Sequence, residues 1–259
     1  MTVLSAERVS LRFGDRDAIA EVSLEVRGGE FVALLGPNGA GKTSLLRTLS
    51  GLARPTHGRV LVDDRAITDL APSERGRRIA FLAPARIGVP SAYRVDEVIG
   101  LARFAHRSWW QTTGRDDPAI NGAVRRFGLD GLRSRRLGTL SDGERQRVWL
   151  AALEAQDPEI LLLDEPTSHL DVAHVADTLR ALRGWAAAGR AVVAVLHDLD
   201  AALAAANRIV VLQGGHVVRD APTSRLEPQA IGDAFGVTFA AAVVSRRQRG
   251  LVVDYEAER

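Results

Sequence analysis

The sequence predicts an α/β protein with a mostly parallel β-sheet, an antiparallel β part at its N-terminus and an inserted group of helices. Short apolar blocks within "FVALLG", "EILLLDE" and "RAVVAVLHD" alternate with stretches of helical spacing, which is typical of a parallel sheet covered on both faces. Residues 1–30 instead alternate apolar and polar side chains, which favours antiparallel strands. A long middle region has helical spacing throughout.

The expected elements can be placed in order along the chain. Turns at Gly14 and Gly28–Gly29 would separate short antiparallel strands, and a buried strand over 31–35 would lead into a helix beginning near Gly41. The later elements are a strand pair over 58–70, strands within 78–83, 159–166, 191–198 and 208–215, and helices at 95–105, 118–128, 143–156, 172–188 and up to 206. The predicted units are a core over 1–84 and 158–226, a helical insertion over 85–157 and a tail over 227–259.

Composition excludes several classes of function. The 259 residues are 46% hydrophobic and carry a formal net charge of only +2, so no nucleic-acid partner is expected. The absence of cysteine excludes disulfides, thiolate nucleophiles and Cys-ligated metals. No stretch approaches the roughly 18 apolar residues of a membrane span, and the N-terminus has no signal-peptide pattern. A cytoplasmic protein is therefore expected.

The only lysine of the chain stands in a Gly-rich turn between a predicted strand and helix. "GPNGAGKT" satisfies G-x-x-x-x-G-K-[ST], in which backbone N–H groups cradle phosphates. Lys42 would reach the β- and γ-phosphates because a slim ammonium fits a narrow backbone nest better than a guanidinium, and Thr43 would bind Mg²⁺. The alternative is a Gly-rich turn with an incidental lysine. The expected phosphate-binding residues are Gly36, Pro37, Asn38, Gly39, Ala40, Gly41, Lys42, Thr43 and Ser44.

Two later strands end in polar residues that suit this chemistry. Asp164 follows "ILLL" and is expected to hold Mg²⁺, while Glu165 would face the attacking water as general base. The alternative for Glu165 is that it caps the turn at Pro166. His197 follows "AVVAVL" and, at the same sheet edge, would contact the γ-phosphate rather than play only a structural role.

A further motif brings in a family resemblance. "LSDGERQR" precedes the acidic strand by about twenty residues and resembles the L-S-G-G-Q signature of ATP-binding cassette (ABC) proteins. The segment "SHLD", Ser168 to Asp171, is similar to the D-loop of that family, and the order of all motifs agrees. The resemblance covers essentially the whole chain. It implies a P-loop NTPase (RecA-like) core with an antiparallel β-subdomain and an α-helical signature subdomain, and ATP with Mg²⁺ as cofactors.

The family's architecture implies that two copies of the chain face each other head to tail around two ATP molecules. The signature of one copy would close on the nucleotide held by the P-loop of the other. The expected signature contacts are Ser141, Asp142, Gly143 and Glu144. Phe13 stands where the family places an aromatic ring on adenine; the alternative is a core residue.

The sequence also resembles one group within the family, the ATPases of importers for iron-siderophore, haem and cobalamin. "LSDG", "VVAVLHDL" and "ARFAHRSWW" carry this softer resemblance. It implies a membrane permease, an extracytoplasmic substrate-binding protein and a position on the cytoplasmic face of the membrane. The region from Arg86 to Trp110 would contact the permease, although Trp109 and Trp110 would equally suit the core of the insertion.

One position departs from the family. The family has Pro-Gln after the strand "RRIAFL", whereas this chain has Ala83-Pro84. ATPase activity is therefore expected to be lower than is usual for the family. This keeps open a second reading, a regulatory cassette with weak hydrolysis. A non-transport cassette acting on nucleic acid or ribosomes is disfavoured because the chain has neither tandem cassettes nor long coiled-coil insertions.

Overall fold

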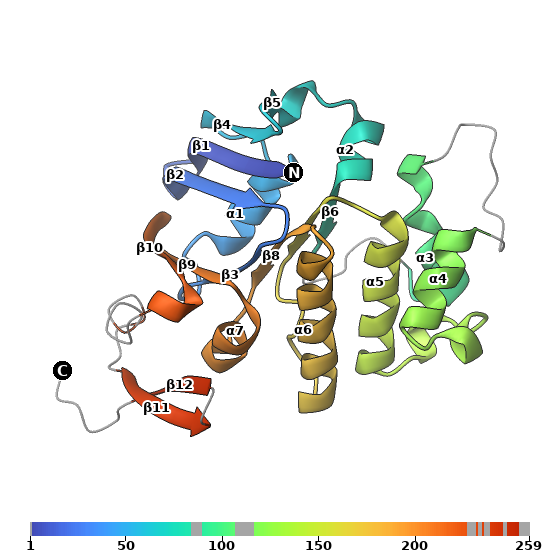
Figure 1. Cartoon of the computed structure of the whole chain (residues 1–259). Coiled ribbons are helices and arrows are strands. Elements are labelled where there is room, and N and C mark those ends of the chain that lie inside the picture. Colours follow the sequence, from blue (N-terminus) through green and yellow to red (C-terminus); the bar gives the residue numbers. More distant parts are fainter. Residues whose placement is uncertain are drawn as a thin grey trace.

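The computed structural model describes residues 2–83, 90–106 and 117–226, together with residues 232, 235, 239–245 and 248–253 near the C-terminus. A six-stranded sheet forms the centre, in the order β10-β9-β3-β8-β7-β6, and is parallel except for β10 (Figure 1). Its strands are β3 (Phe31–Leu35), β6 (Ile79–Leu82), β7 (Ile160–Leu163), β8 (Ala191–Val195), β9 (Arg208–Gln213) and β10 (His216–Pro222). The prediction of a mostly parallel sheet is confirmed.

The central strands are apolar on both sides because both faces of the sheet are covered. In β3, Val32 and Leu34 pack towards the N-terminal sheet and α1 (Lys42–Leu49), while Phe31, Ala33 and Leu35 pack against the opposite helices. Those helices are α6 (Val172–Ala187) and α7 (Leu199–Ala205), with one face of α5 (Asp142–Gln156). Successive side chains along each strand therefore pack into two different hydrophobic cores, one on each face of the sheet.

The N-terminal part is a four-stranded antiparallel sheet in the order β2-β1-β4-β5. Its strands are β1 (Val3–Phe13), β2 (Arg16–Arg27), β4 (His57–Val62) and β5 (Arg65–Ala66). The expectation of short strands before residue 30 is wrong, because β1 and β2 run for 11 and 12 residues and absorb register shifts through bulges. The strand pair expected over 58–70 also stops early, since 3₁₀-helix η1 (Ile67–Asp69) follows β5.

A helical unit is inserted between two neighbouring strands, β6 and β7. It contains α3 (Val95–Leu101), α4 (Pro118–Arg126) and α5, with 3₁₀-helices η2 (Phe104–His106), η3 (Asp130–Leu132) and η4 (Leu137–Thr139). Residues of α3, α4 and α5 build a third core of their own. Helix α5 contributes to this core and also to the core beneath the sheet, so it joins the two parts (Figure 1). The unit boundaries at 84/85 and 157/158 stay predictions.

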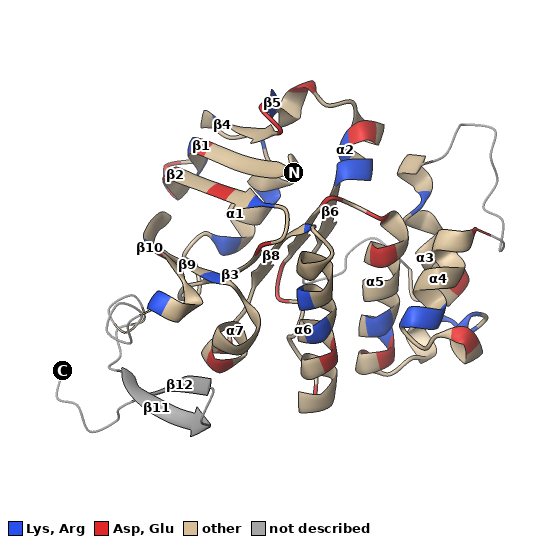
Figure 2. Ribbon diagram, in the orientation of Figure 1, with Lys and Arg blue, Asp and Glu red and all other residues tan. Residues whose placement is uncertain are grey.

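The remaining elements are small. Helix α2 (Pro72–Arg78) precedes β6, 3₁₀-helix η5 (Thr223–Arg225) follows β10, and β11 (Phe239–Ser245) pairs with β12 (Gln248–Val253). Charges of both signs are interspersed over the outer helices, whereas β3, β7 and β8 carry none (Figure 2). Within the ranges that the structure describes, no helix is both long enough and apolar enough to cross a bilayer. The predictions made for Pro84, Arg86, Trp109 and Trp110 lie outside the described residues.

Candidate nucleotide-binding site

A cleft of about 370 Å³ opens at the carboxyl end of β3, where the chain turns into α1. It is lined by the loop and first turn after β3, by the end of β1, and by Glu165 beyond β7. This is the edge of a parallel sheet at which ligands bind in such folds. The lining residues are Phe13, Arg16, Ala18, Asn38, Gly39, Ala40, Gly41, Lys42, Thr43, Ser44 and Glu165.

The loop after β3 needs glycine for steric reasons. Gly41 has φ 102°, a left-handed conformation that favours glycine, and it is the N-cap of α1. A β-carbon there would lie within 3.0 Å of the Ala18 carbonyl oxygen. The first turn of α1 therefore starts with open backbone N–H groups and the positive end of the helix dipole facing the cleft.

Lys42 folds over this loop. Its Nζ donates to the carbonyl oxygens of Gly36 at 2.7 Å and Pro37 at 2.9 Å, and the side chain is buried. Burial lowers the pKa of Lys42, while the nearby Glu165 and Asp164 carboxylates act in the opposite direction. The ammonium is therefore held by backbone oxygens at the floor of the cleft, where an anionic ligand would receive its charge.

Asp164 is a buried carboxylate without a hydrogen bond. The residue is 1% exposed, and neither Oδ1 nor Oδ2 has a hydrogen-bond partner among the described residues. Burial raises the pKa of Asp164, and the neighbouring Thr43 hydroxyl and Lys42 ammonium oppose that shift. Two unpartnered carboxylate oxygens beside a hydroxyl form the oxygen donor set that Mg²⁺ prefers. The residues present fit the predicted metal ligands Thr43 and Asp164.

Glu165 and His197 are brought together at the mouth of the cleft. His197 Nε2 lies 2.7 Å from Glu165 Oε1, and the Ser168 hydroxyl donates to Glu165 Oε2 at 3.1 Å. Burial disfavours the charged carboxylate, but the hydrogen bond and charge of His197 and the bond from Ser168 outweigh it and lower the pKa of Glu165. Glu165 also has φ 51°, a strained conformation for a residue with a side chain. Its carboxylate is thus ionised and fixed in direction by His197 and Ser168.

One aromatic and one basic side chain, Phe13 and Arg16, also line the cleft. Phe13 is 63% exposed at the rim, which excludes the alternative that it is a core residue. Arg16 follows the β1–β2 turn and lines the same cleft. Arg16 could not be singled out from the sequence, because it is one of 33 arginines and belongs to no motif.

The signature-like residues stand elsewhere, on the helical unit. Ser141 is the N-cap of α5: its Oγ accepts from the Glu144 N–H at 3.2 Å, and Glu144 Oε2 accepts from the Ser141 N–H at 2.8 Å. In this capping box both side chains hydrogen-bond to backbone N–H groups of the first turn, and the bond from the Ser141 N–H lowers the pKa of Glu144. Asp142 is paired with Arg145 and Gly143 is buried. None of the four is among the lining residues of the described cleft.

The cleft and the sheet define a class of protein. The features at this sheet edge are a glycine-rich loop with one buried ammonium, a buried carboxylate and an ionised Glu165 in contact with His197, and together they define a P-loop nucleotide-binding protein.

Comparison with known proteins agrees and is more specific. The family model described as "ABC transporter" matches residues 19–168. The hemin import ATP-binding protein HmuV of Pseudomonas fluorescens is 38% identical, over 97% of this chain and 99% of its own length. An inward-facing structure assigned to a metal-chelate type ABC transporter superposes with TM-score 0.84 at 25% identity, covering 99% of both chains. A dimeric bacterial ABC transporter cassette superposes with TM-score 0.75 at 27% identity, covering 85% of this chain and 98% of the other.

The chain belongs to the ABC transporter family, as an ATPase subunit. Its architecture is the ABC cassette fold predicted from the sequence: a mostly parallel sheet with an antiparallel part and an inserted helical unit.

Proposed function

We propose that this chain binds ATP with Mg²⁺ in the cleft beside β3 and hydrolyses it to power the import of haem across a membrane. The observation that carries the proposal is the meeting of Lys42, Asp164 and Glu165 at one sheet edge in a chain that matches a hemin import ATP-binding protein over nearly its whole length. Haem is the proposed cargo because that relative is named for it and 38% of its aligned residues are identical.

The roles of the side chains follow from their contacts. The glycine-rich loop and Lys42 would bind the phosphates, and Phe13 would stack on adenine at the exposed rim. Glu165, ionised and oriented by His197, would accept a proton from the attacking water. Mg²⁺, held by Thr43 and Asp164, would supply positive charge that neutralises the triphosphate.

Two copies are needed to complete the site in this proposal. The start of α5 presents backbone N–H groups at a helix N-terminus but does not line the chain's own cleft. A second copy in head-to-tail orientation would bring Ser141, Asp142, Gly143 and Glu144 to the open side of the nucleotide. The pairing of Asp142 with Arg145 partly neutralises a carboxylate that would otherwise repel the phosphates.

A permease is the proposed membrane partner, on the cytoplasmic face, together with an extracytoplasmic haem-binding protein. Large apolar side chains are exposed near the junction of the core and the helical unit: Leu52, Leu101 and Phe104, the last 77% exposed. Helix α2 contacts η2 there, and Arg75 of α2 donates to the Gly51 carbonyl. These side chains offer apolar area to another protein. Trp109 and Trp110 lie outside the described residues.

The test is ATP hydrolysis and haem uptake by the purified chain with its permease in liposomes. We expect hydrolysis that rises when hemin-loaded binding protein is present and does not rise with ferric siderophore or cobalamin. Glu165→Gln should bind ATP and form dimers on size exclusion while turnover falls by about a hundredfold or more. Wild-type turnover in Glu165→Gln would remove its assignment as general base.

A regulatory cassette with weak hydrolysis is a second candidate. The observation that favours it is Ala83-Pro84 in place of the Pro-Gln of the family. ATP binding without turnover, even with the permease present, would support this second candidate over the first.

A further inference from the structure

The start of α5 is joined to the start of α6 by one imidazole ring. His174 lies in the first turn of α6, and a β-carbon at Gly143 of α5 would lie within 3.0 Å of three atoms of its ring. The ring therefore lies directly on the glycine α-carbon. Gly143 is required here for packing within the chain, in addition to any contact with a nucleotide.

The ring is held in place from its other side. Asp171, the N-cap of α6, accepts from the His174 N–H at 2.9 Å and contacts Nδ1 at 2.8 Å through the same Oδ1. These two bonds fix the imidazole against the backbone of its own helix start, so Nε2 and the ring edge are directed at Gly143.

A second connection runs beside the first. Gln146, one turn further along α5, donates from Nε2 to the Pro166 carbonyl oxygen at 2.6 Å. Pro166 directly follows Glu165, and Ser168 donates to the Glu165 carboxylate. The start of α5 thus contacts Pro166 directly, next to the proposed general base, and reaches Asp171, the cap of α6, through the His174 ring.

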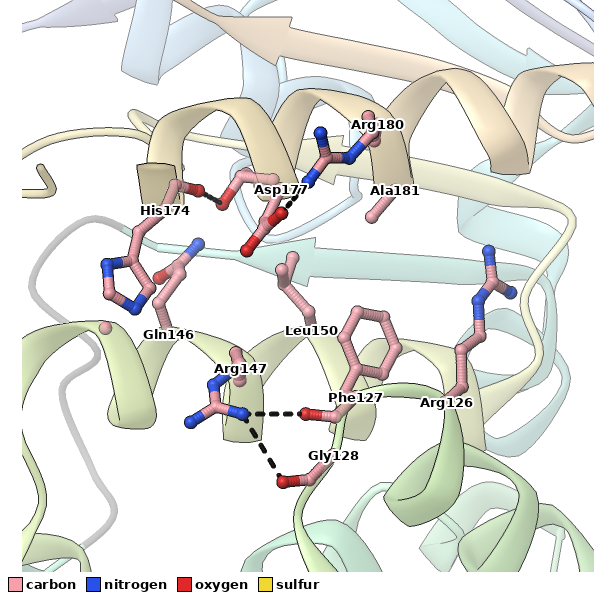
Figure 3. A pocket seen from close by; sticks show the side chains of 12 residues that line it. Arg126, Phe127, Gly128, Gln146, Arg147, Leu150, His174, Asp177, Arg180 and Ala181 are labelled. Carbon is pink, nitrogen blue, oxygen red and sulfur yellow. Dashed lines mark hydrogen bonds and ion pairs between the residues drawn. The ribbon is translucent and has the colours of Figure 1, made fainter. Parts of the chain in front are cut away.

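Further along, a cavity lies between the two helices, and they meet again where Trp185 of α6 donates to the Glu154 carboxylate of α5. Figure 3 shows His174 and Gln146 at one end of a cavity of about 420 Å³, with Leu150, Arg147 and Phe127 further along. Residues of both helices line this cavity. Near its start, α5 is held against the segment that carries Glu165 by the contacts of His174 and Gln146.

We propose that His174 is a positioning residue that couples the two ATP sites of the dimer. The ring fixes the position of the α5 start relative to the segment that carries Glu165. The α5 start would contact nucleotide bound to the second copy, whereas Glu165 acts on nucleotide in its own cleft. A shift at one site is passed to the other through the ring. The proposal rests on the two-copy arrangement put forward above.

The test compares His174→Ala and His174→Phe with wild type in steady-state ATPase assays, with His216→Ala as control on the exposed start of β10. We expect wild type to hydrolyse ATP with a Hill coefficient above one, and His174→Ala with a coefficient of about 1 and a kcat/KM lowered about tenfold. His174→Phe, which keeps a ring of similar size, should restore part of the cooperativity. ADP binding, which uses only the cleft of one chain, should be unchanged in all variants.

Three results would overturn the proposal. Wild-type kcat, KM and Hill coefficient in His174→Ala would show that the ring transmits nothing. Weakened ADP binding in that variant would show that the ring merely supports the fold of the cleft. Failure of Glu165→Gln to dimerise with ATP would refute the two-copy arrangement itself. This measurement does not involve His174, so it distinguishes an error in the proposed dimer from an error in the role given to His174.

Discussion

Replacing Asp164 by asparagine is expected to make the nucleotide-free protein more stable. Asp164 is 1% exposed and both its oxygens lack hydrogen-bond partners among the described residues. A buried polar group left unpaired costs about 1–3 kcal/mol, and more when it is charged. Asparagine removes the charge but leaves an amide unpaired, so we expect a net gain of about 1–2 kcal/mol in the free energy of unfolding. At this chain length that raises Tm by roughly 3–6 °C.

The gain should depend on pH in a defined direction. Burial raises the folded pKa of Asp164 above its unfolded value, so the native state holds the proton more tightly than the unfolded state. The cost of the ionised carboxylate therefore appears as pH rises through the folded pKa, and it is absent below the unfolded pKa. The stability difference between Asp164→Asn and wild type should be small in acid and largest at neutral pH and above.

Urea denaturation at several pH values measures this difference, with Asp130→Asn as a control because the Asp130 side chain is 63% exposed. The control should stay within about 0.5 kcal/mol of wild type. In the presence of Mg²⁺ and ATP the order should reverse, because wild type gains ligand-binding energy that Asp164→Asn lacks. A variant with native circular dichroism that is no more stable than wild type at neutral pH would refute this reasoning.

Three further outcomes are expected. Trp185→Ala should lower the free energy of unfolding by about 3–5 kcal/mol in urea titrations, because the indole is fully buried against Phe127; a loss below 1 kcal/mol would contradict the packing. Phe13→Ala should weaken ATP binding about tenfold in a fluorescence titration while Phe13→Tyr binds as wild type, since only the ring face is needed; equal affinity in both would remove the stacking role. Pro84→Gln should raise turnover in a phosphate-release assay by restoring the glutamine of the family, and unchanged turnover would remove that explanation.

The parts of the fold that the sequence predicted well are those fixed by local signals. The strands β3, β7 and β8 are continuous apolar runs closed by glycine or charge, and the phosphate-binding loop is a local motif. The sequence does not predict helix α2, because "PSERGRR" buries no residue and so has no apolar period. The sequence predicts short N-terminal strands where the structure has two long ones, because Arg8 and Glu21, both at positive φ, interrupt the alternation at bulges.

The site was only partly visible in the sequence. The prediction that Glu165 and His197 share a sheet edge rested on the rule for parallel strands, but their contact depends on the register that pairs Leu163 with Ala194. The hydrogen bond from Ser168 to Glu165 and the packing of the His174 ring on Gly143 depend on the three-dimensional fold, and no sequence pattern predicts these contacts. The site assignments themselves stay predictions until they are tested by mutation.

The solitary lysine has a practical consequence for labelling. Lys42 provides the only side-chain amine of the protein, and it sits at the floor of the cleft with a pKa lowered by burial, so its amine loses its proton more readily than a surface lysine. An amine-directed reagent small enough to enter would modify a single side chain, and bound nucleotide would shield it. Mass spectrometry of one tryptic region would then read the occupancy of the cleft directly, without a reporter group.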